Sequence, residues 1–178
     1  MSRPVAPMPA KLVIGLFTRY TCLAKPVIEQ MKKLFGPVEL ISPWFEFKWT
    51  RYYEPEMGAD LLRRMVAFAP LIEQDQLPAI KQQTNTLESQ YTDCGNRQVN
   101  IDPGYLLSER FVLATGKNFT HRIYLGRQIY ADLTLIYQKG GFQALPWTYP
   151  DYAQQNIKAF LTRVRNKYQR DLKMDGHL

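Results

Sequence analysis

The chain has 178 residues, of which 46% are hydrophobic and 22% charged, so its composition is that of an ordinary globular domain and excludes a disordered or fibrous protein. Its 23 Lys and Arg residues exceed its 16 Asp and Glu residues, and the formal net charge of +7 is compatible with an anionic partner. The two isolated cysteines, Cys22 and Cys94, exclude the usual zinc sites.

One domain is expected over residues 11–172, preceded by a proline-rich disordered arm at 1–10 and followed by a flexible tail at 173–178. The apolar run at 12–17 is too short for a secretory leader or a membrane span. A cytoplasmic protein without a membrane partner is therefore expected.

The first half of the chain alternates strand and helix patterns. The predicted elements are a strand at 11–18, a helix ending at Gly36-Pro37, strands at 38–53 and 63–70, a helix capped by Asp75, and a strand at 97–101. This βαββαβ order is that of the ferredoxin-like plan, in which two helices pack on one face of an antiparallel sheet.

The second half predicts a β-meander and a final helix. Its strands are expected at 110–115, 121–125, 128–137 and 142–145, with a turn at Gly126-Arg127, and the helix opens at Pro150-Asp151. The fold class is thus α+β, with a mainly antiparallel sheet, a ferredoxin-like start, a meander and a C-terminal helix.

The common nucleotide-binding signatures are absent from the sequence. Gly116-Lys117 is followed by Asn118, so the phosphate-binding loop of the P-loop type is missing, and no guanine-reading N-K-x-D motif occurs. We therefore expect no GTP hydrolysis of that type.

Two segments concentrate polar and aromatic residues beside proline and glycine. In the first, Tyr53 and Glu54 precede Pro55, which either marks a plain loop or directs Glu54 into a site. In the second, Asp102 opens an Asp-Pro-Gly sequence that predicts a turn at a strand end, and Tyr105 follows it and is expected on a pocket wall.

The predicted meander carries a second polar group. Tyr130 and Asp132 share one face of a strand, and a turn after residue 125 would bring His121 or Arg122 beside Asp132. A buried Asp132 is expected to be paired, because an isolated charge in mid-strand is costly. His121 is either a satisfied core residue or part of a site.

Four sequence blocks carry a resemblance that spans the chain from about Lys11 to the last helix. They are RYYEPEMG, RQVNIDPGYL, HRIYLGRQIYADLTLIYQKGGF and LPWTYPDY. In order and spacing they resemble domain-of-unknown-function family 4416 of bacteria and archaea. The resemblance implies neither an established activity nor agreed catalytic residues.

Two functions of different classes fit these residues. The first is a site that binds or acts on a small phosphate- or carboxylate-bearing molecule. Its catalytic candidates are His121, Asp132 and Asp102, and its ligand-binding candidates are Tyr53, Glu54, Tyr105, Arg122 and Tyr130. No short ligand spacing supports a metal site, and the sequence identifies neither a cofactor nor an oligomeric state.

The second is an RNA-associated module that uses exposed aromatics and the basic C-terminal helix. Residues 158–173 carry six Lys and Arg residues against one acid. A partner-binding protein without chemistry is the third alternative.

Overall fold

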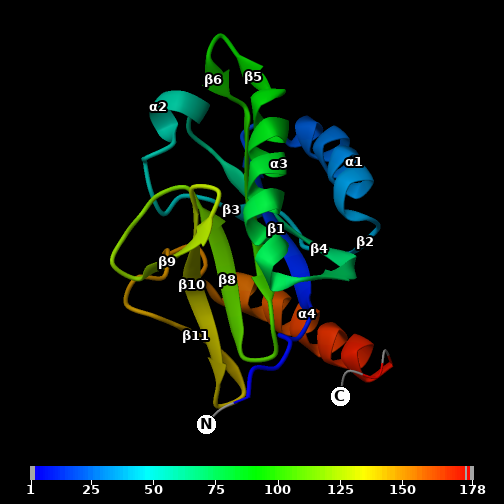
Figure 1. Ribbon diagram of the computed structural model, residues 1–178. Helices are drawn as coiled ribbons and strands as arrows, with labels where there is room; N and C mark the ends of the chain where they lie inside the picture. Colours follow the sequence, from blue (N-terminus) through cyan, green and yellow to red (C-terminus); the bar gives the residue numbers. More distant parts are fainter. Residues whose placement is uncertain (1–2, 175, 177–178) are drawn as a thin grey trace.

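The computed structural model describes residues 3–174 and residue 176. Within them it is an α+β protein with a mainly antiparallel sheet of nine strands, a separate two-stranded hairpin and four α-helices (Figure 1). The strands are β1 (Ala10–Thr18), β2 (Val38–Ile41), β3 (Phe45–Glu46), β4 (Leu62–Ile72), β5 (Thr92–Asp93), β6 (Asn96–Arg97), β7 (Val99–Leu106), β8 (Arg110–Thr115), β9 (Arg122–Gly126), β10 (Ile129–Gln138) and β11 (Gly141–Ala144). The helices are α1 (Ala24–Phe35), α2 (Glu54–Met57), α3 (Leu77–Ser89) and α4 (Gln155–Met174), with short 3-10 turns at Thr21–Leu23 and Gln74–Gln76.

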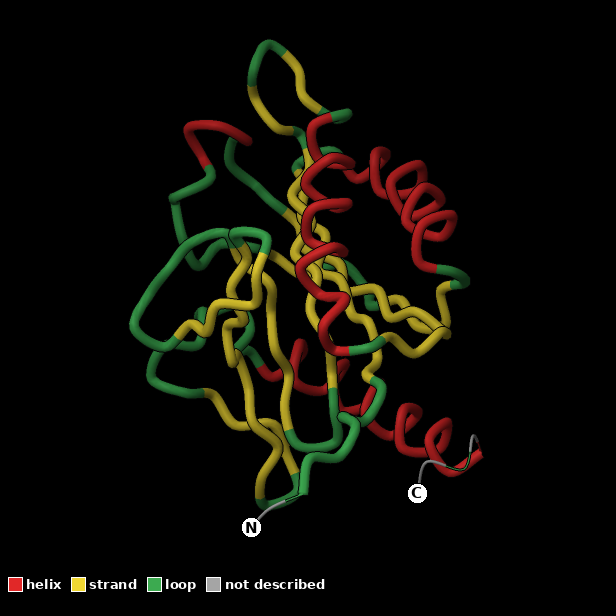
Figure 2. Tube along the Cα trace, viewed as in Figure 1, coloured by secondary structure: helices red, strands yellow, loops and turns green. Residues whose placement is uncertain are grey.

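Helices cover both faces of the large sheet. The strands follow the order β11-β10-β8-β7-β1-β4-β2, with β3 beside β4 and β9 beside β10. Figure 2 shows the helices around the strands of the sheet. Leu12, Ile14 and Leu16 of β1 share a core with α1 and α3, whereas Val13 belongs to the core that contains α4. The central strand is therefore buried on both faces, which explains its continuous apolar sequence.

The strand predicted over 38–53 is wrong in its middle and end. The structure ends β2 at Ile41, restarts briefly as β3, and leaves most of the following residues outside any strand. Pro43 has no N–H for a sheet ladder, and the hydroxyl of Ser42 accepts a hydrogen bond from the Met65 N–H of β4 at 2.9 Å. This side-chain bond interrupts the regular pairing of the two strands.

The turn predicted at Asp102-Pro103-Gly104 is also wrong, because these residues lie inside β7. Asp102 pairs with Gly15 and Gly104 pairs with Val13 of β1, in an unbroken antiparallel register. Long-range pairing with the central strand thus overrides the local preference of Asp-Pro-Gly for a turn.

The β9–β10 hairpin forms as expected, with its turn one residue later than predicted. Arg127 and Gln128 have positive φ values of 54° and 63°, as a tight hairpin turn requires. A register shift between Ile129 and Tyr130 then places Arg122 directly opposite Asp132.

The segment before β1 is hydrogen-bonded to the last helix at Pro9. Residues 3–9 form no helix or strand, and the Tyr168 hydroxyl of α4 donates to the Pro9 carbonyl at 2.7 Å. The helix continues to Met174, and the other positions of the expected arm and tail, 1–2, 175 and 177–178, lie outside the described residues. Cys22 and Cys94 are both free thiols at the surface.

Candidate functional site

A cavity of about 680 Å³ opens where β7 and β8 separate. Its walls come from these two strands, from α3, β4, β6 and β10, and from the connecting segments 47–53, 116–117 and 149–152. The charged and amide side chains that line it are Arg63, Lys81, Asn85, Glu88, Arg97, Asn100, Asp102, Lys117, Asp132 and Asp151. We call it the β7–β8 cavity.

β7 pairs with β8 only from Gly104 onward, and the two strands are unpaired before that residue. The N–H and C=O of Ile101 are bonded by α3 side chains, so they point away from β1 and toward the cavity. Backbone groups two residues apart in a strand point to the same side, which places the missing N–H of Pro103 on that side as well. Pro103 therefore cannot donate to β8 at the point where the split begins.

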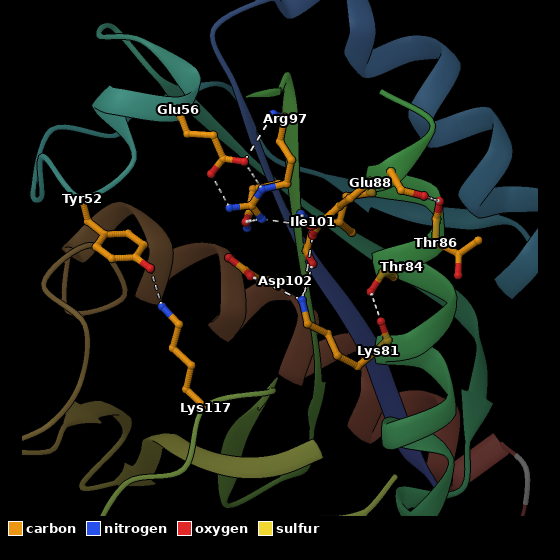
Figure 3. A network of polar contacts seen from close by, with 12 residues as sticks. Tyr52, Glu56, Lys81, Thr84, Thr86, Glu88, Arg97, Ile101, Asp102 and Lys117 are labelled. Atoms are coloured by element: carbon orange, nitrogen blue, oxygen red, sulfur yellow. Dashed lines mark hydrogen bonds and ion pairs between the residues drawn. The ribbon is translucent and has the colours of Figure 1, made fainter. Parts of the chain in front are cut away.

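Two side chains of α3 take the place of the missing strand. Lys81 Nζ donates to the Ile101 carbonyl at 2.9 Å, and Glu88 Oε1 accepts from the Ile101 N–H at 2.7 Å (Figure 3). Burial raises the pKa of Glu88, and the positive charge of Lys81 opposes that rise. Both residues thus satisfy buried backbone groups while bordering the cavity.

Arg97 joins three polar side chains on the side of the cavity next to α2. It forms a bidentate ion pair with Glu56 of α2, in which Nε donates to Oε1 at 2.6 Å and Nη2 donates to Oε2 at 2.8 Å. Its Nη1 also donates to Glu88 Oε2 at 3.1 Å and to Asn100 Oδ1 at 2.9 Å. The buried Nδ2 of Asn100 has no hydrogen-bond partner among the described residues.

Arg63 lies at the floor, with 3% of its surface exposed. Its guanidinium sits over the rings of Phe17, Phe47 and Tyr152, at 4.6–5.1 Å from their centroids. It forms an ion pair with Asp151 at 2.7 Å. Because this cation is caged by aromatic rings and neutralised by Asp151, we assign it a structural role.

Asp102 lies between two cations without contacting either closely. Its carboxylate is 3.5 Å from Arg63 Nη2 and 3.9 Å from Lys81 Nζ. Figure 3 shows it beside Lys81, with the contact between Tyr52 and Lys117 across the cavity. In that contact Lys117 Nζ donates to the Tyr52 hydroxyl at 2.9 Å, and this bond lowers the pKa of Tyr52.

The predicted pairing of Asp132 is confirmed. Its carboxylate accepts from Arg122 Nε at 2.9 Å and lies 3.2 Å from His121 Nε2, and the residue is 1% exposed. Arg122 also donates to the Tyr149 hydroxyl at 2.6 Å and to the Lys117 carbonyl at 2.9 Å. Asp132 borders the β7–β8 cavity, and its two partners brace the cavity wall from β9 and the turn before it.

The other candidates divide between the cavity and elsewhere. Tyr53 lines the cavity beside Asp102. Tyr105 does not form a pocket wall, because it lies three residues from Asp102 on the opposite face of β7, in the core. Glu54 is exposed on α2, and Tyr130 packs against the ring of Tyr124 in the hairpin.

Sequence reasoning missed the basic residues of the cavity and its α3 wall. Lys81 and Glu88 are seven residues apart, two helical turns, on the face of α3 that also buries Thr84. Polar residues recurring on the buried face of a predicted helix were the available signal. Arg97 ends the short strand β6 and Lys117 lies in the loop after β8, and neither carried such a signal.

We expect Glu56→Gln to loosen α2 while leaving the rest of the fold intact. Hydrogen bonds from Arg97 lower the pKa of Glu56, so this contact stabilises the fold above the ordinary value of 4.5 and is lost as the pH falls through the lowered pKa. Hydrogen exchange measured by mass spectrometry at neutral pH should become faster across residues 50–58. Glu54→Gln, on the exposed side of the same helix, is the matched control, and equal acceleration in both variants would contradict the assignment.

The fold and the cavity define an α+β protein with a polar site at a split between two antiparallel strands. The family described as Domain of unknown function (DUF4416) matches residues 8–168, and the chain belongs to this family. Neither curated proteins nor solved structures gave a match to the chain.

Two further features are absent from the described part of the chain. None of the helices there has the length and apolar character needed to cross a membrane. No group of three or more His, Cys, Asp or Glu side chains among its residues is placed to hold a metal ion.

Proposed function

We propose that the protein binds, or acts on, a small anionic molecule bearing a phosphate or carboxylate group in the β7–β8 cavity. The observation that carries this proposal is an excess of uncommitted hydrogen-bond donors in the cavity wall. Lys81 uses one of its three N–H groups on Ile101, and the Asn100 amide has a free N–H. Lys117 lies at the cavity opening, and among the described residues its ammonium group donates to the Tyr52 hydroxyl alone.

Most of the acidic side chains in the wall are already occupied. Asp151 is paired with Arg63, Asp132 with Arg122, and both oxygens of Glu88 accept hydrogen bonds. An incoming molecule therefore meets donors that lack acceptors, which favours an anion. The proposal gives direct ligand contact to Lys81, Lys117 and Asn100, and gives His121 and Arg122 a positioning role through Asp132.

Lys117→Met should weaken the binding of an anionic probe such as butyl phosphate about 3- to 10-fold, because it removes one charge-assisted hydrogen bond at the cavity mouth. Isothermal titration calorimetry at low salt measures the affinity. The matched control is Lys25→Met, which makes the same charge change on the exposed side of α1. Equal weakening in both variants would mean that net charge alone attracts the probe, and would contradict the proposal.

We also infer that the first half of the chain follows the ferredoxin-like plan. The order β7-β1-β4-β2, the antiparallel pairing of each neighbouring pair, and a shared core of α1 and α3 on one face support this inference.

RNA association is the second candidate, favoured by exposed apolar side chains around β9. Phe119, Ile123 and Tyr124 each expose more than half of their surface, and the rings of Phe119 and Tyr124 would offer stacking platforms. The basic helix supports it less, because Arg165 is bound to the Ser108 carbonyl and Lys167 pairs with acidic side chains. Binding of this kind would weaken steeply with salt.

A further inference from the structure

The carboxylate of Asp102 is an uncommitted hydrogen-bond acceptor of the β7–β8 cavity. Its distances of 3.5 Å to Arg63 and 3.9 Å to Lys81 are too long for hydrogen bonds. Within the described part of the chain no side chain donates to it, and 25% of the side chain is exposed. A molecule in the cavity would therefore find free donors and, in Asp102, a partly exposed free acceptor. Asp151 Oδ2 also lacks a hydrogen bond among the described residues, but it is buried in its ion pair with Arg63.

The charges around Asp102 favour a neutral donor over an ammonium group. The carboxylate of Asp102 already has two cationic neighbours, Arg63 and Lys81. Arg63 is itself paired with Asp151, and Lys81 lies near Glu88. An ammonium group at Asp102 would be repelled by these two cations at short range in a partly desolvated site. A hydroxyl group donates a hydrogen bond to the carboxylate without adding charge.

The aromatic side chains of the cavity add a surface for the carbon face of such a molecule. Tyr53 is half-buried next to Phe17 and Phe47, and Trp49 and Tyr149 are partly exposed at the rim. Burial, followed by the charge of Asp102, raises the pKa of Tyr53, so its hydroxyl keeps its proton. An aromatic ring with a polar tip suits a ring that is apolar on its face and hydroxylated at its edge.

We infer that the anionic ligand is polyhydroxylated, a sugar phosphate or sugar acid, with one of its hydroxyl groups donating to Asp102. This inference rests on the proposed function, because it takes the anionic group to be held by Lys81 and Lys117. It adds the part of the ligand that Asp102 and the aromatic rings recognise.

The test compares hydroxylated probes with unhydroxylated probes of the same charge. The pairs are ribose 5-phosphate with butyl phosphate, glucose 6-phosphate with hexyl phosphate, and glucuronate with hexanoate, each titrated into the full chain by calorimetry. At least one hydroxylated probe should bind about 10- to 100-fold more tightly than its partner, the range expected for hydrogen bonds to a charged group.

The variant Asp102→Asn should remove this preference selectively. Loss of the negative charge leaves butyl phosphate binding unchanged or tighter, while the advantage of the sugar phosphate should fall about 10-fold. Asp93→Asn, an exposed change in the β5–β6 hairpin, should leave the ratio intact. Thermal unfolding of both variants checks that each is folded at the temperature of the titration.

The outcomes separate the two proposals. If the unhydroxylated member of every pair binds as well as its partner, or if Asp102→Asn preserves the ratio, this inference is wrong while anion binding stands. If no probe of either kind binds the wild-type chain, both the inference and the proposed function are overturned.

Discussion

Asp132→Ala is expected to destabilise the protein by about 3–5 kcal/mol, because it leaves the buried guanidinium of Arg122 without its counter-charge. Asp132 is almost fully buried, and the side chains of Arg122 and His121 that contact it are themselves less than a tenth exposed. For a chain of this length the melting temperature should fall by roughly 10 °C, measured by circular dichroism. Probe binding below that temperature should persist, because Asp132 supports the wall of the cavity and does not itself contact the ligand.

The control for this variant is Asp93→Ala, which removes an exposed carboxylate and should leave the melting temperature within about 2 °C of the wild type. A stable Asp132→Ala variant that has lost all probe binding would reverse the assignment. Asp132 would then be a ligand-contacting residue rather than a positioning one.

Gly104→Ala is expected to disrupt the point where β7 and β8 begin to pair. A Cβ at this position would overlap the backbone carbonyl oxygen of Val112 and press on the side chains of Leu113 and Phe111. The carbonyl belongs to β8 and cannot rotate away, so the strands must move apart, at a cost of about 1–3 kcal/mol or more. Both the melting temperature and the probe affinity should fall.

The comparison for this variant is Gly116→Ala, at the end of β8, where a Cβ would meet no atom within 4 Å. It should unfold at the wild-type temperature. If Gly104→Ala did the same, the close approach of the two strands would not be what fixes the split, and the origin of the cavity would lie in the α3 contacts alone.

The local part of the site could be predicted from the sequence. The short hairpin limited the neighbours of Asp132 to His121 or Arg122, and both contact it in the structure. The choice of Arg122 as the residue directly opposite could not be counted from the turn, because a register shift between Ile129 and Tyr130 moves the pairing by one residue. The interrupted edge strands could not be predicted in the same way, because the Ser42 hydroxyl bond to β4 depends on a strand 20 residues further along the chain.

The cavity itself could not be predicted from local patterns. Asp102 was selected as part of a turn, yet its position depends on pairing with Gly15, almost 90 residues away. Tyr105 was placed on a pocket wall because the turn was expected to end the strand, and the continuation of β7 carries it into the core. The basic residues of the cavity come from four separate segments, which only the tertiary fold brings together.

The replacement of a strand by two helical side chains restricts how the recognition properties of this cavity can diverge among relatives. Replacing Lys81 by a residue without a donor, or Glu88 by one without an acceptor, leaves a backbone group of Ile101 unpaired, so such changes in ligand preference come with a loss of stability. Asn85 and Trp49 line the same cavity, and within the described residues their side chains hold no backbone hydrogen bond. Relatives that recognise different molecules should therefore differ first at positions such as these, where the side chain supports no backbone group.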